Sequence, residues 1–336
     1  MRIGVAGLGF MGGTHLQAYQ KVARAEIVAV ASSDAKKLAG DRSTSQGNLE
    51  RSAEALDLGE AARYRSAEEL IADPNVEAVD LCVPSYRHAS LALAALRAGK
   101  HVLVEKPMAL NAADCDAMIA ASHESNRVLM VAQVLRFWPD YVEARRRVLS
   151  GELGAVKAAF FRRKCAAPAW SPWMRDRAKS GGGIFDLLIH DVDFSLHLLG
   201  KPKAVAAVGV EDLANGLDVV DARFEYESGI PVSISGGWHL PSEYPFSMEF
   251  SIVLEGGTLD FHSAHKPLTL YRKDGPAEEL PLPKSDAFQS ELAAFVAACE
   301  TGAPPKECRP EESALATRIA LTMRTSRDQG GLRLAL

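Results

Sequence analysis

The 336-residue sequence predicts two domains, an α/β domain with a parallel sheet followed by an α+β domain with a largely antiparallel sheet. In the first third, short β-branched runs alternate with amphipathic helical segments, as expected of βαβ units. From about residue 153, strand patterns follow one another with little helix between them. The length suits two separate apolar cores. We therefore expect one domain at residues 1–130 and a second at residues 131–336.

The first domain is predicted from its alternating pattern, with strands at residues 2–6, 26–31, 78–83, 101–105 and 128–133. Helical patterns lie at residues 85–98, closed by Gly99, and at residues 111–125, where Asn111 can cap the first turn. Residues 40–52 are polar and rich in glycine and serine, which predicts a surface insertion.

The second domain is predicted from consecutive strands at residues 156–164, 204–210, 219–227, 231–237, 247–254 and 257–262. Most of the later strands are separated only by turns, which indicates antiparallel pairing. Helical patterns at residues 285–301 and 310–329 complete this domain.

Composition argues against several classes of protein. The net charge of −5 comes from interspersed acids and bases, so we expect no nucleic-acid or membrane partner. No stretch approaches the ~20 apolar residues that cross a bilayer, and glycines interrupt the apolar residues 3–12, so we interpret these as a strand and turn rather than a signal peptide. The pair His262 and His265 is too small a ligand set for a metal, and we expect none. A reducing, cytoplasmic location is expected because no C-x-x-C pair occurs among Cys82, Cys115, Cys165, Cys299 and Cys308.

A glycine-rich turn follows the first strand directly and opens a helical pattern, with the sequence Gly7-Leu8-Gly9-Phe10-Met11-Gly12. In a dinucleotide-binding fold, the first glycine forms the tight turn, the second lets the backbone approach the pyrophosphate, and the third lets the helix pack on the strand. The amino end of the helix then faces the phosphate charge. We therefore predict NAD or NADP as the cofactor, bound by residues 7 and 9–12.

The end of the second strand bears on the choice between these cofactors. An acid usually contacts the adenosine ribose of NAD here, but the sequence has Ser32, followed by Ser33 and Asp34. Ser32 can tolerate a 2′-phosphate that Lys36 or Lys37 would pair with. Alternatively, Asp34 reaches the ribose, or it only caps the next helix. We include Ser32, Ser33, Asp34 and Lys37 among the predicted cofactor-binding residues and leave the phosphate state of the cofactor open.

Two further segments carry chemically active side chains. Glu105-Lys106-Pro107 ends a buried strand at the edge where open α/β sheets bind ligands. Gly181-Gly182-Gly183 leads into a helical pattern on which four polar residues form a stripe about 60° wide at 100° per residue. We interpret this stripe as an active-site face, made of Asp186, His190, Asp193 and His197.

Together these features resemble the family named after glucose-fructose oxidoreductase, inositol dehydrogenase and a rhizopine-catabolism protein. Order and spacing agree over nearly the whole chain. The matching elements are the glycine turn, Val83-Pro84 followed by His88, Ala98-Gly99-Lys100-His101 leading into Glu105-Lys106-Pro107, and the three glycines with Asp186-x-x-x-His190-x-x-Asp193.

The resemblance implies a Rossmann domain and an open, mostly antiparallel sheet domain, with cofactor and substrate in the cleft between them. It implies that Lys106, Asp186 and His190 are catalytic. It also implies that Val83, Pro84, His88 and Glu105, with Lys106, lie along the cofactor, and that copies of the chain assemble through the second sheet as a dimer or tetramer. The sequence departs from the commonest family pattern at Ser32, where an acid is usual, and at Ser85, where Asn often follows the proline.

The function predicted from these residues is hydride transfer between nicotinamide and a carbinol of a sugar, inositol or related polyol. His190 would act as acid and base, oriented by Asp186 or Asp193, while Lys106 stabilises the alkoxide. Two alternatives are an NAD-dependent glycosidase that uses transient oxidation and a non-catalytic regulator that binds the cofactor. Trp170 and Trp173 either line the substrate site or pack their own loop.

Overall fold

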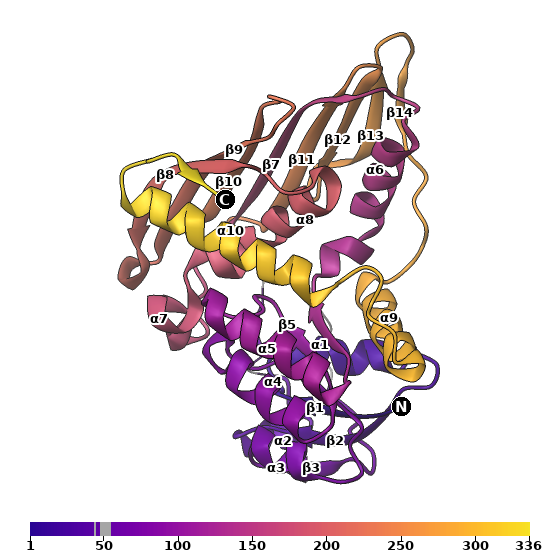
Figure 1. The fold of residues 1–336 in the computed structure, drawn as a ribbon. Helices are drawn as coiled ribbons and strands as arrows, with labels where there is room; N and C mark the ends of the chain where they lie inside the picture. Colours follow the sequence, from indigo (N-terminus) through magenta and orange to yellow (C-terminus); the bar gives the residue numbers. More distant parts are fainter. Residues whose placement is uncertain (44, 48–54) are drawn as a thin grey trace. The chain divides into compact units, whose positions relative to one another are not determined.

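The computed structural model describes residues 1–43, 45–47 and 55–336, which form two compact units (Figure 1). Unit 1 comprises Met1–Val134 and Ser285–Ala314, and unit 2 comprises Leu135–Lys284 and Leu315–Leu336. Residues 44 and 48–52 of the predicted insertion lie outside the described residues.

Unit 1 contains a six-stranded sheet in which every neighbouring pair is parallel, as predicted. The strand order reverses between β1 and β4, and at such a point the carboxyl ends of the strands form the ligand-binding edge of α/β sheets. The short outer strand β3 was not predicted. In spatial order the strands are β3 (Ala62–Tyr64), β2 (Glu26–Ala31), β1 (Arg2–Ala6), β4 (Ala78–Leu81), β5 (His101–Glu105) and β6 (Leu129–Ala132).

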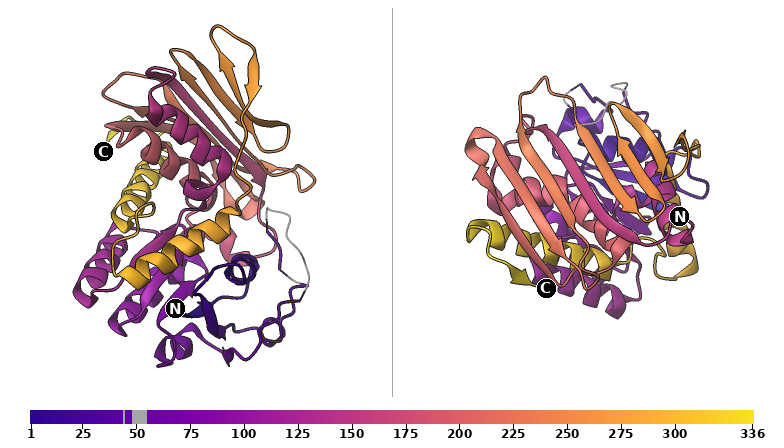
Figure 2. Two further views of the ribbon diagram at one scale, coloured as in Figure 1. Left: turned by 90° about the vertical axis from the view of Figure 1, so that its right-hand side faces the viewer. Right: turned by 90° about the horizontal axis from the view of Figure 1, so that it is seen from above.

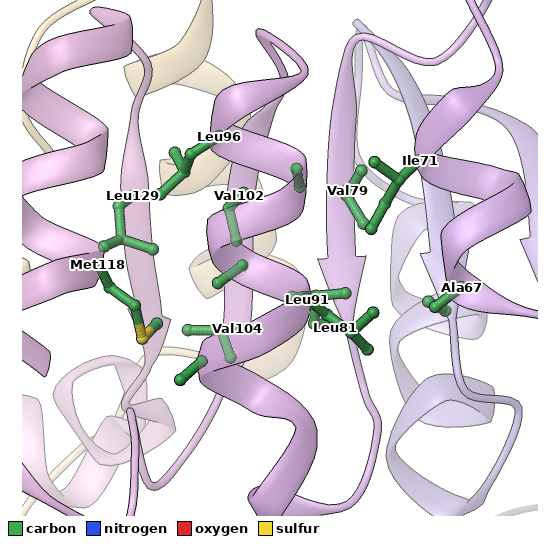
Figure 3. Packing of buried hydrophobic residues seen from close by; sticks show 14 of the residues in the cluster. Ala67, Ile71, Val79, Leu81, Leu91, Leu96, Val102, Val104, Met118 and Leu129 are labelled. Carbon is green, nitrogen blue, oxygen red and sulfur yellow. The ribbon is translucent and has the colours of Figure 1, made fainter. Parts of the chain in front are cut away.

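The core of unit 1 forms where β-branched and leucine side chains of the central strands meet apolar helix faces. The helices joining the strands are α1 (Phe10–Tyr19), α2 (Ala35–Leu38), α3 (Ala67–Ala72), α4 (His88–Arg97) and α5 (Ala112–Ser125). Figure 3 shows the packing of α3, α4 and α5 against β4, β5 and β6 through Ala67, Ile71, Val79, Leu81, Leu91, Leu96, Val102, Val104, Met118 and Leu129.

Helix α9 (Ala287–Thr301), which we had assigned to the second domain, packs in unit 1. Its Gln289 side chain donates a hydrogen bond to the carbonyl of Lys21 at 2.9 Å, and Arg24 pairs with Glu300 at 3.0 Å. The ring of Phe288 lies 6.2 Å from that of His15, centroid to centroid. The amphipathic pattern of this segment shows which helix face is apolar, but not which partner covers that face.

Unit 2 contains a nine-stranded mixed sheet that is mostly antiparallel and does not close, which confirms the predicted fold class. Among the described strands of this second sheet, only β7 and β10 pair in parallel. The strands β13, β14 and β15 were not predicted. The order is β14 (Ala277–Glu279), β13 (Lys266–Arg272), β12 (Gly257–His262), β11 (Ser247–Leu254), β7 (Val156–Ala166), β10 (Val232–Leu240), β9 (Leu217–Glu225), β8 (Ala204–Asp212) and β15 (Leu334–Ala335).

Helices α6 (Pro139–Ser150), α8 (Ile189–Leu199) and the unit 2 part of α10 (Pro310–Asp328) lie on one face of this sheet (Figures 1 and 2). The core beneath them includes Tyr141 of α6, whose ring meets Phe194 of α8 at 4.7 Å and Phe250 of β11 at 5.0 Å. Along β7 and β9, buried side chains alternate with more exposed ones, as expected when only one face of a sheet is covered.

Two further observations concern the residues that the structure describes. No disulfide joins the five cysteines, all of which lie in the described part of the chain. Within the described ranges, no helix has both the length and the apolar character required to cross a bilayer.

Candidate active site

The glycine-rich turn connects β1 to α1, and two of its glycines are required by the packing of the turn itself. Gly7 has φ +96°, and a β-carbon there would overlap the carbonyl of Cys82 at the end of β4. A β-carbon at Gly12 would overlap the carbonyl oxygen of Gly7. These two positions therefore exclude any larger residue regardless of ligand.

Gly9 differs from both, because a β-carbon there would meet no atom of the described residues within 4 Å. It is the N-cap residue of α1, and it offers no side-chain acceptor to the amide groups of the first turn. Phe10 and Met11, which follow it, are partly exposed. An open approach to a helix amino end is what a dinucleotide pyrophosphate requires, so these residues fit the predicted cofactor.

The segment after β2 holds the residues that bear on cofactor choice. Asp34 caps α2, since its carboxylate accepts the amide N–H of Lys36 at 2.9 Å. The Ser32 hydroxyl accepts the amide N–H of Asp34 at 3.2 Å. Asp34 therefore caps the helix, which was one of the roles predicted for it. Ser33 is exposed and Lys37 is partly exposed.

Val83, Pro84 and His88 follow β4. Val83 and Pro84 are partly exposed, whereas His88 is 1% exposed. The ring nitrogens of His88 lie 2.7 Å from the carbonyl oxygen of Pro107 and 2.9 Å from that of Val83. Burial lowers the pKa of His88. His88 thus joins the turns at the carboxyl ends of β4 and β5.

Lys106 comes directly after β5 and is partly exposed, while Glu105 and Pro107 on either side are buried. Its amide N–H donates to Oε2 of Glu105 at 3.1 Å. The edge of the sheet in unit 1 therefore brings together the glycine turn, Val83, Pro84, His88, Glu105 and Lys106.

Asp186 and His190 lie in unit 2, on a helical segment that follows the three glycines. The first turn, η4 (Ile184–Leu188), is π-helical and contains Asp186, and α8 continues from it with His190. Between Gly181 and Leu198, only Asp186, His190 and His197 are not fully buried. π-Helical turns are frequent at functional sites.

Asp193 does not belong to this partly exposed set, which corrects the predicted stripe. It is 1% exposed, and its carboxylate accepts two hydrogen bonds from Arg136, at 2.8 Å from Nε and 2.7 Å from Nη2. With both oxygens bound to Arg136, Asp193 is a structural residue. Of the two predicted partners for His190, Asp186 remains.

Asp191 forms a second buried pair on the same helix. Its carboxylate accepts hydrogen bonds from Nε of Arg163 on β7 at 2.7 Å and from Nη2 at 3.0 Å. Sequence reasoning missed both arginine partners, because they lie 57 and 28 positions from their aspartates.

Asp218 on β9 binds the start of the π-helical turn. Its carboxylate accepts the amide N–H of Gly183 at 2.6 Å and Nη1 of Arg327 at 2.6 Å. Burial raises the pKa of Asp218 to about 6, although Arg327 and the Gly183 amide oppose this rise. Gly182 has φ +78°, and a β-carbon there would lie 2.5 Å from the Asp218 carboxylate. The sequence contains no local signal for this contact.

The remaining candidates have simpler environments. Burial, together with Arg136 and Arg145, lowers the pKa of His197 to about 3, so this imidazole stays neutral near pH 7. Trp173 packs against a buried cluster of its own unit that includes Leu187 and Trp238, which favours the packing interpretation for this residue. Trp170 is partly exposed.

We predict that Arg136→Met lowers the free energy of unfolding by about 3–5 kcal/mol, because it leaves the buried Asp193 carboxylate without its charge partner. Chemical denaturation measures the change. The control is Arg146→Met on α6. The Arg146 side chain is 56% exposed, so its ion pair with Glu143 should contribute at most about 1 kcal/mol to stability. Equal losses in the two variants would contradict the importance of the buried pair.

Comparison with known proteins supports the family that the sequence resembles. Residues 1–133 match the family described as an oxidoreductase family with an NAD-binding Rossmann fold, and residues 141–260 match the GFO/IDH/MocA C-terminal domain. Inositol 2-dehydrogenase 2 of Saccharopolyspora erythraea is 31% identical over 318 residues, covering 90% of this chain and 86% of that enzyme.

Two other proteins show the extent of the similarity. Myo-inositol 2-dehydrogenase of Thermotoga maritima is 35% identical over 202 residues, and this match spans 60% of the chain but only 55% of that enzyme. The structure of levoglucosan dehydrogenase in complex with NADH has a TM-score of 0.84 at 20% identity, covering 100% of this chain and 98% of that one, which shows a shared fold. The chain therefore belongs to the GFO/IDH/MocA family of oxidoreductases, whose amino-terminal domain is an NAD-binding Rossmann fold.

Proposed function

We propose that this protein transfers hydride between a nicotinamide cofactor and a carbinol of a sugar, inositol or related polyol. The observation that carries the proposal is the pair Asp186 and His190, which stay partly exposed on a helical segment where, up to Leu198, every other residue except His197 is buried. The two inositol 2-dehydrogenases among its relatives favour this substrate class. Described cysteines that form no disulfide favour a reducing compartment such as the cytoplasm.

In the proposed mechanism, the bound nicotinamide supplies the hydride acceptor or donor. His190 takes the proton from the substrate hydroxyl during oxidation and returns it during reduction. Asp186 orients the imidazole of His190. The Lys106 ammonium stabilises negative charge on the same oxygen.

The cofactor is proposed to rest on the Gly7–Gly12 turn, with Val83, Pro84, Glu105 and Lys106 beside it. His88 contributes by fixing the two turns whose carbonyls it contacts. The missing acid at Ser32 favours NADP slightly over NAD, with Lys37 as a partner for the 2′-phosphate.

We also propose that copies of the chain associate through the uncovered face of the nine-stranded sheet. This face presents large apolar side chains that water would otherwise surround: Phe160 of β7 is 43% exposed, and Val208 and Val210 of β8 are 54% and 57% exposed. Closed assemblies of identical chains commonly bury such patches.

A thermal-shift comparison of NAD+ and NADP+, followed by absorbance of reduced nicotinamide across a panel of polyols and sugars, tests the function. We expect stabilisation by a cofactor and reduction of it by at least one polyol or sugar. Tight cofactor binding without turnover of any carbinol would indicate a regulator. Release of a sugar from a glycoside without net reduction would indicate a glycosidase.

We predict that Gly9→Val weakens cofactor binding by more than about tenfold, or about 1.4 kcal/mol, with an unchanged unfolding midpoint. The valine would occupy the space that the pyrophosphate needs, and it would meet no described protein atom at its β-carbon. Gly12→Val is the matched control, because it should lower stability by overlapping the Gly7 carbonyl. Unchanged cofactor affinity in folded Gly9→Val would refute this placement.

The affinity ratio for the two cofactors should shift towards NAD in Ser32→Asp, since a carboxylate there would accept from the ribose and repel a 2′-phosphate. Isothermal titration of both cofactors measures the ratio. A wild-type protein that already prefers NAD strongly would contradict the expected preference. In that case Asp34→Asn, which retains the capping oxygen, would test Asp34 as the ribose contact.

We predict that His190→Asn lowers turnover about 10²- to 10⁴-fold, the usual value of acid and base assistance, with little change in cofactor affinity. Lys106→Ala should lose turnover comparably. Because both groups serve one proton-transfer step, the double variant should lose far less than the product of the single losses. His265→Asn, an exposed position in the same unit, is the control. Near-normal turnover in folded His190→Asn, or fully multiplicative losses, would exclude the shared mechanism.

A further inference from the structure

A buried group of charged residues lies beneath the glycine turn in unit 1. His15 on α1 is completely buried, and its Nδ1 lies 2.8 Å from the Asp80 carboxylate on β4. Its Nε2 lies 3.2 Å from Oε1 of Glu105 at the end of β5. One imidazole therefore lies between two carboxylates from neighbouring strands.

The geometry is that of an imidazolium between two carboxylates. The contact of Nδ1 with Asp80 is a hydrogen bond and that of Nε2 with Glu105 is an ion pair, and only the charged imidazole carries an N–H on both nitrogens that face these carboxylates. Burial alone lowers the pKa of His15, but the charge and hydrogen bond of Asp80 raise it well above its ordinary value. Burial raises the pKa of Glu105, yet the adjacent His15, followed by the charge of Lys106, lowers it overall.

The same residues do not form a metal centre. His15, Asp80 and Cys82 are close enough to share an ion, but the 2.8 Å contact between Nδ1 and Asp80 leaves no room for an ion between these two atoms. Burial, and then the charge of Asp80, raises the pKa of the Cys82 thiol, which opposes its ionisation to a ligand. Direct ion pairing accounts for this cluster.

Glu105 connects this cluster to Lys106. While Oε1 faces His15, Oε2 accepts the amide N–H of Lys106 at 3.1 Å. His15 lies three positions after Gly12, on α1, whose N-cap residue is Gly9. A continuous line of contacts therefore runs from the helix of the cofactor turn, through His15 and Glu105, to the backbone of Lys106.

We propose that His15 is a positioning residue: its imidazolium holds the Glu105 carboxylate in place and thereby fixes Lys106 relative to the cofactor turn. This inference rests on the proposed function, in which Lys106 acts on the substrate oxygen. Asp80 orients the imidazole from the other side, as the outer partner of a ligating histidine does in metal sites.

The test uses the full chain with its nicotinamide cofactor bound and compares His15→Gln with His123→Gln. His123 lies on α5 in the same unit and is 70% exposed, so the control should behave as wild type. We expect kcat to fall about 10- to 100-fold in His15→Gln, the scale seen when an outer-shell partner is lost. KM and cofactor affinity should change little, because the glycine turn remains.

A second readout does not require turnover. Trinitrobenzenesulfonate labels lysine amines, and peptide mass spectrometry gives the rate at each lysine. In His15→Gln, Lys106 should be labelled faster, while Lys100 should keep its rate. Lys100 is the internal control, since its Nζ donates to the carbonyls of Asp73 and Val76 at 2.9 Å and 2.6 Å in the same unit. Faster labelling of both lysines would mean general loosening and would overturn a specific positioning role.

A second variant covers the case in which two buried carboxylates without their cation prevent folding. His15→Gln combined with Asp80→Asn removes one positive and one negative charge, so the net charge of the cluster is retained while Glu105 loses its partner. The same loss of kcat and the same faster labelling of Lys106 are expected. Normal kcat and normal Lys106 labelling in either folded variant would overturn the proposal. If Lys106→Ala retains turnover, the catalytic role of Lys106 fails, but the labelling result still decides whether His15 holds it.

Discussion

Two buried ion pairs determine how the helix carrying His190 is oriented. Asp191 pairs with Arg163 and Asp193 pairs with Arg136, each through two hydrogen bonds. Successive residues of an α-helix are about 100° apart, so these two carboxylates point in directions about 200° apart. A buried carboxylate that lost its arginine would carry a large desolvation penalty, which opposes rotation of the helix about its axis. His190 directly precedes Asp191 on the same helix, so its direction is fixed as a consequence.

The beginning of this helical segment is held by the carboxylate of Asp218 rather than by an ion pair from the helix itself. Asp218 accepts the Gly183 amide, one of the N–H groups that a helix leaves unpaired at its start, and places a negative charge at the positive end of the helix dipole. Burial raises the pKa of Asp218 to about 6 in the folded protein. Because the folded pKa is raised, the stability contributed by the protonated carboxyl is lost as pH rises towards about 6. Near neutral pH the charged Asp218 carboxylate therefore lowers stability, and its contact with Arg327 keeps it in position. Asp186 follows within the next turn.

Local patterns in the sequence were sufficient for the parallel sheet, the glycine turn and the positions of most strands along the chain, because each depends on periodicity or on turn chemistry within a few residues. They failed where a distant partner decides the outcome. Asp193 falls on the polar stripe of a regular helix, but the π-helical turn breaks that regularity and Arg136 lies 57 positions away. His15 was not predicted as a site residue, because its partner Asp80 lies 65 positions away in the sequence. Helix α9 follows the second sheet in sequence but groups with unit 1, which its pattern did not indicate because an apolar face does not identify what covers it.

Local packing accounts for some of the residues at these sites but not for others. Gly7 and Gly12 are necessary because backbone atoms of the chain fill the space beside them, whereas no described atom requires a glycine at position 9. Lys106 remains partly exposed between buried neighbours, and so does His190. A charged or titratable group that is partly exposed gains little free energy from packing. Its buried neighbour Glu105 loses hydration free energy, and its contact with His15 offsets that loss. The physical case for function at these positions is therefore that packing alone would accept other residues there.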